Sequence, residues 1–137
     1  MNKRLLKTQK AILFISGALL IAVGAFILVS PDAFFSANNI DLGVNISLLN
    51  ELKAPAALLL VAGVYIIVGV FVRRLTDAAT WLSALIYLSY AASRFLSMAV
   101  DGMPAEGLVQ AAVLEGIVGL LCLAMVAAQR EPKTELA

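Results

Sequence analysis

Long runs of apolar residues alternate with short polar segments along the whole chain. Spanning the roughly 30 Å hydrocarbon core of a bilayer takes about 20 predominantly apolar residues in a helix. Four segments meet that requirement, at residues 11–29, 55–72, 78–100 and 108–128. The pattern predicts an all-α, integral membrane four-helix bundle that forms a single domain over residues 1–128. A polar, disordered cytoplasmic tail is expected at 129–137.

The connections between the four segments set their order in space. RRLTD (73–77) joins the second segment to the third, and DGMPAEG (101–107) joins the third to the fourth. Connections this short require antiparallel neighbours. The first connection, residues 30–54, is longer, and we expect Pro31 and Asp32 to end the first helix where it begins.

Part of this long connection has the pattern of a helix. Apolar residues recur at helical spacing in ISLLNELKA (46–54). We expect this stretch to extend the second helix outward, past a bend at Pro55, because proline removes a backbone donor and crowds the preceding turn. Asn45 or Ser47 would cap the helix, since short polar side chains accept hydrogen bonds from first-turn amides.

Basic residues gather at one end of the predicted bundle. With an even number of spans, eight of them fall on one side: Lys3, Arg4, Lys7, Lys10, Arg73, Arg74, Arg130 and Lys133. Cytoplasmic loops of membrane proteins carry an excess of lysine and arginine. We therefore expect both termini in the cytoplasm and the acidic loops outside, across a bacterial inner membrane. The first apolar segment is expected to be retained, because it is longer than the roughly 7–15 apolar residues of a signal peptide.

Polar residues recur at helical spacing within the third segment. Six of them, which we call the polar stripe, are spaced 4, 3, 4, 3 and 4 residues apart and share one helix face: Ser83, Tyr87, Tyr90, Arg94, Ser97 and Asp101. An unsatisfied polar group in hydrocarbon is costly, so this face must turn toward the inside of the bundle.

Arg94 has one matching acidic residue on the next helix. It precedes Asp101 by seven residues, which places it roughly 10 Å below the outer boundary at about 1.5 Å per residue. Glu115 follows Leu108, where the fourth segment enters from the same boundary, by seven residues as well. An ion pair between Arg94 and Glu115 is therefore expected, because a lone charge at mid-helix costs about 2.5–3.5 kcal/mol on insertion scales.

The residues around this pair suggest a pocket that opens outward. Arg94 and Glu115 would form its floor, and Asp101 and Glu51 would lie at its rim, where Glu51 could cap the site from above. Ser97 lies on the same face as Arg94 and Asp101 and is a further candidate for ligand binding. The hydroxyls of Tyr87 and Tyr90 would lie below Arg94 and could join the same hydrogen-bond network. A guanidinium fork suits a lipid headgroup or another small anion.

The same residues carry a resemblance to a known family. Its features are E-L-K-A-P at 51–55, Gly63 and Gly69, S-R-x-x-S-x-x-x-D-G-x-P at 93–104, and a lone Glu115. Over about residues 11–128 the chain resembles a family of small bacterial four-helix integral membrane proteins known as a domain of unknown function. The resemblance implies the architecture and draws attention to Glu51, Arg94, Ser97, Asp101 and Glu115, without an activity.

Composition narrows the choice of function. The chain is 62% hydrophobic and 14% charged, against about 45–50% and 25% in soluble domains. It has no histidine and one cysteine, Cys122, and no nucleophile elbow or metal-ligand cluster. The sequence therefore points to no enzyme, no metal and no cofactor, and a net charge of +1 indicates no nucleic-acid partner.

Several functions stay open at this level. The ion pair could be purely structural, since buried pairs specify geometry more dependably than they stabilise. It could form the floor of a site for an amphiphilic or anionic small molecule, or for a membrane lipid. An oligomeric ion or proton channel or transporter, with Glu115 titrating, and an accessory subunit of a membrane complex are the alternatives. Small residues such as Gly17, Gly24 and Gly63 would let helices approach closely and could support a homo-oligomer.

Overall fold

The computed structural model describes residues 3–130 and consists of helices and their connections. In chain order they are α1 (Lys3–Val29), α2 (Pro31–Ser36), α3 (Ile46–Phe71), the 3₁₀ helix η1 (Arg73–Leu75), α4 (Thr76–Asp101) and α5 (Glu106–Arg130). Four helical stretches, of 24 to 29 residues, are long and apolar enough to cross a membrane. The chain is therefore an integral membrane four-helix bundle.

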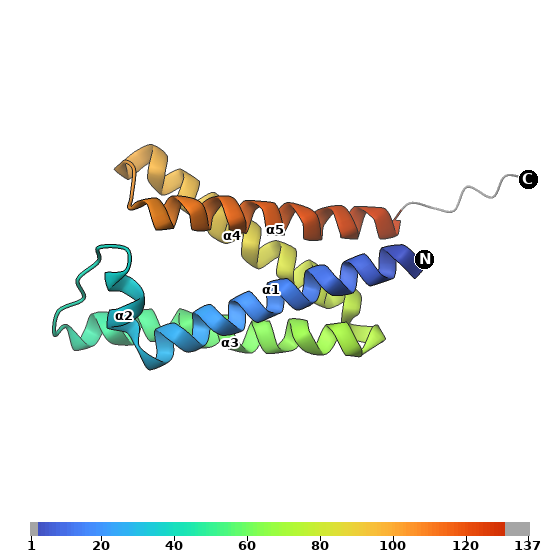
Figure 1. Cartoon of the computed structure of the whole chain (residues 1–137), viewed down its shortest axis with the longest axis horizontal. Helices are drawn as coiled ribbons and strands as arrows, with labels where there is room; N and C mark the ends of the chain where they lie inside the picture. The colour runs from blue at the N-terminus through green and yellow to red at the C-terminus, as the bar shows by residue number, and fades with distance from the viewer. Residues whose placement is uncertain (1–2, 131–137) are drawn as a thin grey trace, which may run out of the picture.

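The long helices associate as two pairs (Figure 1). α1 packs along α3 and α4 packs along α5, and each long helix runs opposite to the one before it. The start of α1 and the end of α5 lie at one end of the bundle, which we call the terminal end. α2 and the turn between α4 and α5 lie at the other end, which we call the loop end.

Glycines set the distance between α1 and α3. A Cβ atom added to Gly63 would lie 2.7 Å from the carbonyl oxygen of Gly17, and one added to Gly24 would lie 2.6 Å from the carbonyl oxygen of Ala56. Real Cβ atoms do not approach other atoms this closely. The two backbones are in direct contact, as the sequence predicted, because small residues at helix interfaces in membranes allow close van der Waals packing.

The long first connection is more structured than the sequence indicated. α1 ends at Val29, and Pro31 then occupies the first turn of the separate helix α2, where its missing N–H costs no hydrogen bond. Asn45 caps α3 as predicted, because its side chain accepts a hydrogen bond from the amide of Leu48 at 3.0 Å. α3 then continues without interruption through Pro55.

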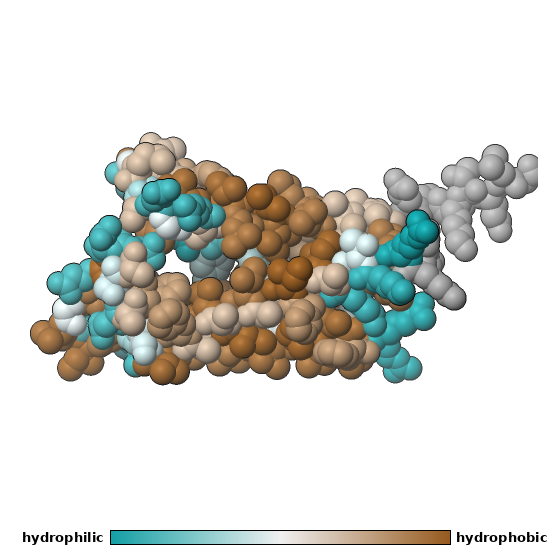
Figure 2. Space-filling view, in the orientation of Figure 1, coloured by the Kyte–Doolittle hydropathy of each residue, from teal (hydrophilic) through white to brown (hydrophobic). Residues whose placement is uncertain are grey.

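The core is small and the surface is apolar. Buried residues such as Leu13, Leu59, Ile66 and Val118 form one cluster between the helices. Large apolar side chains, including Phe14, Leu58 and Leu85, are more than half exposed. Figure 2 shows apolar residues over the middle of the molecule and hydrophilic ones gathered near both ends. This distribution suits contact with lipid along the flank.

Replacement of Gly63 by alanine tests the close contact between α1 and α3. The added methyl group meets the backbone of α1, which cannot move aside as a flexible side chain could. We expect Gly63→Ala to lower the free energy of unfolding by about 1–3 kcal/mol, measured by unfolding in mild detergent.

Gly116→Ala is the matched control. A Cβ atom at Gly116 meets only the Cβ of Ala91, at 3.8 Å, which is ordinary contact. Since alanine favours a helix over glycine by up to about 1 kcal/mol, this variant should unfold no more easily than the wild type. Equal stability of the two variants would contradict the packing described for α1 and α3.

Candidate functional site

The terminal half of the polar stripe is closed against α1. The Oγ of Ser83 donates a hydrogen bond to the Oγ of Ser16 at 3.0 Å, and the hydroxyl of Tyr87 donates to the carbonyl oxygen of Ser16 at 2.7 Å. Cys122 of α5 joins them, since its Sγ donates to the Oγ of Ser83 at 3.3 Å. These side chains are buried, and together they join three helices through uncharged hydrogen bonds.

Two threonines continue the polar stripe to the terminal end. Thr80 and Thr76 precede Ser83 by three and seven residues, so they lie on the same face of α4. The amide Nε2 of Gln9 donates to the Oγ1 of Thr80 at 2.8 Å, and the Oγ1 of Thr76 donates to the carbonyl oxygen of Gly69 at 2.9 Å. All three side chains are at most 2% exposed. Polar groups therefore follow α4 along its whole length.

Sequence analysis missed this lower part of the stripe. Thr76 lies in the segment taken as a connection, and Gln9 belongs to the basic stretch that precedes the first apolar run. The 3-and-4 residue spacing upstream of Ser83 was the available signal, because it extends the pattern of the stripe by two more positions.

The expected ion pair is present in the half of the bundle nearer the loop end. The Nε of Arg94 lies 2.9 Å from the Oε2 of Glu115. The side chain of Arg94 remains 30% exposed and that of Glu115 17% exposed. Neither terminal nitrogen of the Arg94 guanidinium donates a hydrogen bond to another residue within residues 3–130. Glu115 thus neutralises the positive charge of Arg94 from the Nε side. The two terminal nitrogens of the guanidinium remain available to another group.

The exposure of Arg94 follows from the divergence of two helices. α1 and α4 cross near the middle of the bundle and separate toward the loop end (Figure 1). The face of α4 that hydrogen-bonds α1 at Ser83 therefore no longer has α1 against it further along. Figure 2 shows a hollow there, between α1 on one side and the α4–α5 pair on the other. By helical spacing Arg94 faces this hollow.

Two other predicted residues bond only to each other. The Oγ of Ser97 donates to the Oδ2 of Asp101 at 2.9 Å, and both are exposed near the end of α4. Glu51 is exposed on α3 and forms no hydrogen bond or ion pair within residues 3–130. The structure therefore gives no sign that Glu51 caps the pair.

The two tyrosines differ from each other. Tyr90 is half-buried and packs against the core. Tyr87 was expected in the hydrogen-bond network of Arg94, and that expectation is wrong, because its hydroxyl donates to the backbone of α1. The reason is geometric: α1 is still in contact with α4 at the level of Tyr87.

Other chemistry is sparse in the described part of the chain. Residues 3–130 contain no group of three or more histidine, cysteine, aspartate or glutamate side chains that could hold a metal ion. A separate open depression of about 370 Å³ lies in the connection between α1 and α3, lined by residues that include Asp32, Asn39 and Asp41. It does not include Arg94 or Glu115.

Comparison with known proteins adds a family but no activity. No curated protein and no solved structure matches the chain. A family model described as a domain of unknown function, DUF4345, matches residues 8–126, which include the polar stripe, Glu115 and the hydrogen-bonded residues of α1. Since the match covers nearly the whole of the described bundle, the chain belongs to the DUF4345 family.

Proposed function

We propose that the protein binds an anionic or amphiphilic molecule in the hollow at the loop end, with Arg94 as the counter-ion. The observation that carries the proposal is the one-sided ion pair. Glu115 engages the Nε of Arg94, and the terminal nitrogens of the same side chain are the ones suited to grip a carboxylate or phosphate. The 30% exposure of Arg94 supports access for such a group.

An isolated charge within the membrane is costly, so Arg94 needs a partner even before a ligand binds. A single charge at mid-membrane costs about 2.5–3.5 kcal/mol on insertion scales. Glu115 offsets that cost, so the helix pair is stable without a ligand. An anion that approaches the remaining nitrogens would add charge-assisted hydrogen bonds of about 1.5–3 kcal/mol each.

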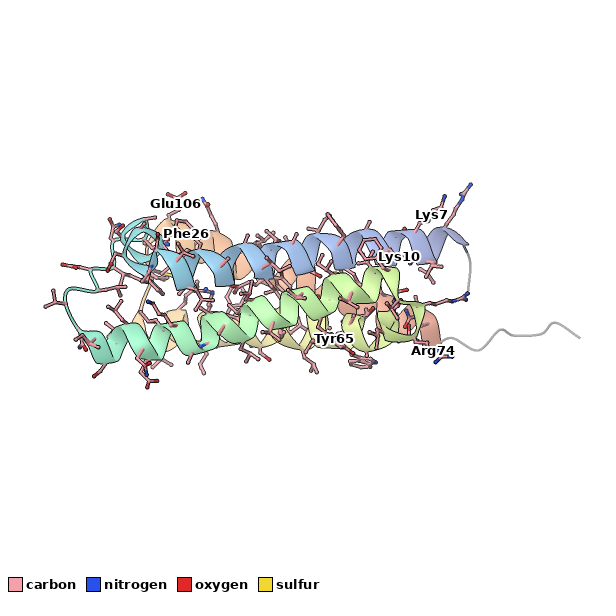
Figure 3. All side chains as sticks on the ribbon, turned by 90° about the horizontal axis from the view of Figure 1, so that it is seen from below. Lys7, Lys10, Phe26, Tyr65, Arg74 and Glu106 are labelled. Atoms are coloured by element: carbon pink, nitrogen blue, oxygen red, sulfur yellow. The ribbon has the colours of Figure 1, made fainter. Side chains whose placement is uncertain are left out.

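The proposed orientation places the hollow on the outer side of the membrane. Lys7, Lys10 and Arg74 project at the terminal end, whereas Glu106 lies at the loop end (Figure 3). The positive-inside tendency therefore supports cytoplasmic termini in a bacterial inner membrane. Lys133 and the side chain of Arg130, two further basic residues expected on the cytoplasmic side, lie outside the described residues.

A purely structural role for the ion pair is the competing interpretation. Buried pairs can fix helix register without any ligand. The two interpretations differ in what a neutral residue at position 94 changes: bound molecules in one case, and only the stability of the α4–α5 pair in the other.

Arg94→Met tests the binding role. Methionine keeps much of the apolar bulk of arginine and removes the charge, so the retained anionic molecule should be lost while the bundle stays folded. Native mass spectrometry of protein released from mild detergent should show an adduct on the wild type and none on the variant. Arg74→Met is the matched control, since Arg74 is an exposed arginine at the terminal end and its removal should leave the adduct unchanged. An adduct of equal abundance on Arg94→Met would refute the proposal.

Glu115→Gln should strengthen anion binding, whereas Arg94→Met should abolish it. Glutamine is close in size to glutamate but leaves the charge of Arg94 uncompensated, so an added anion should bind more tightly, by about tenfold or more. Titration with dodecyl phosphate, followed by native mass spectrometry, measures this change. Glu106→Gln is the control, because Glu106 is exposed at the start of α5. Unchanged affinity in Glu115→Gln, together with lower stability, would indicate a structural pair.

A further inference from the structure

The connection between α1 and α3 reaches across to α5 at the loop end. A Cβ atom added to Gly107 would lie 2.5 Å from the Oδ1 of Asn38. The amide side chain of Asn38 therefore rests on the backbone of the first turn of α5, at a position where glycine leaves room for it. This contact joins the α1–α3 connection to α5 at the loop end.

The segment that makes this contact is held in place. Phe34 of α2 packs edge-to-face against Phe26 of α1, with ring centroids 5.5 Å apart, and against Phe35 at 5.2 Å. The amide of Asn38 donates to the carbonyl oxygen of Phe35 at 3.0 Å, and Leu42 is 6% exposed. Residues 31–42, which we call the cover, thus lie against α1 and α3 at the loop end and reach α5 at Gly107 through Asn38.

The side of the hollow is not covered in this way. It lies where α1 and α4 have separated, on the flank of the bundle (Figures 1 and 2). In the same half of the molecule, α1 and α5 carry exposed apolar side chains such as Phe26, Val113 and Leu114. The hydrocarbon of one leaflet would therefore border the opening.

The depth of Arg94 matches the reach of a lipid from that leaflet. Seven residues separate Arg94 from the end of α4 at Asp101, which corresponds to roughly 10 Å along the helix. In a hydrocarbon core of about 30 Å, this is the outer third. A headgroup drawn slightly inward reaches the guanidinium while its acyl chains stay among apolar side chains.

From this cover and this depth we infer that the occupant of the hollow is the anionic headgroup of a membrane lipid, which enters sideways from the outer leaflet between α1 and the α4–α5 pair. The inference rests on the proposed binding function and specifies its ligand class and its route. A soluble anion would have to pass residues 31–42, whereas a lipid would not. Charge complementarity with Arg94 selects an anionic headgroup over a zwitterionic one.

A disulfide across the cover separates the two routes. Asn38→Cys with Gly107→Cys brings two thiols together across this contact, since the Cγ of Asn38, which the Sγ of a cysteine would replace, lies 3.6 Å from the position of a Cβ at Gly107. The buried Cys122 is replaced by serine in every variant so that it cannot compete. The protein is placed in nanodiscs of equal parts phosphatidylglycerol and phosphatidylcholine and is released for native mass spectrometry.

We expect phosphatidylglycerol to be retained about tenfold over phosphatidylcholine, and Arg94→Met to remove that preference. The oxidised cross-link should leave the preference for phosphatidylglycerol unchanged. An excess of inorganic phosphate should not displace the bound lipid. If the cross-link blocks capture, or phosphate competes, the lateral route is wrong while anion binding at Arg94 stands. If Arg94→Met retains the same lipid as the wild type, the proposed function itself fails.

Discussion

The structure depends on one constraint, which is that the polar groups of α4 must find partners inside an apolar bundle. In the terminal half, α1 supplies those partners through Gln9 and Ser16, and the resulting hydrogen bonds hold α1, α4 and α5 together. Further along, α1 turns away with α3, to which it is bound by backbone contact at its glycines. The same face of α4 must then be satisfied by α5, and Glu115 does so for Arg94.

The two halves of the bundle therefore solve the same problem by different means. In the terminal half, the helices are joined by neutral hydroxyl, amide and thiol groups, and the side chains that carry these groups are almost wholly buried. A charged pair serves the other half and stays partly exposed. Neutral hydrogen bonds suit a dry interface, because no charge has to be buried, whereas an ion pair with free donors suits a surface that meets another molecule.

The sequence predicted the parts that depend on depth and hydropathy. The four spans follow from apolar length, and the Arg94–Glu115 pair followed from equal distance to a shared boundary. What it could not supply was where α1 and α4 separate, because that depends on the glycine contact between α1 and α3. For this reason Tyr87 was assigned to the wrong network, and Gln9 and Thr80 were missed. The short helix α2 was also read as plain connection, since its six residues are too few for a periodic pattern.

The position of Glu115 on the helix that follows Arg94 has a consequence for biosynthesis. The α4 stretch is the least apolar of the four, with a mean hydropathy of 1.2 against 2.3 or more for the others. It emerges from the ribosome with an unneutralised guanidinium, and the carboxylate that neutralises it arrives 21 residues later. Partition of α4 into lipid by itself therefore carries the cost of that charge, and entry together with α5 as a helical hairpin would offset it. The short turn at residues 102–105 would thus matter for membrane integration as well as for the final geometry, because it keeps α4 and α5 together as a hairpin.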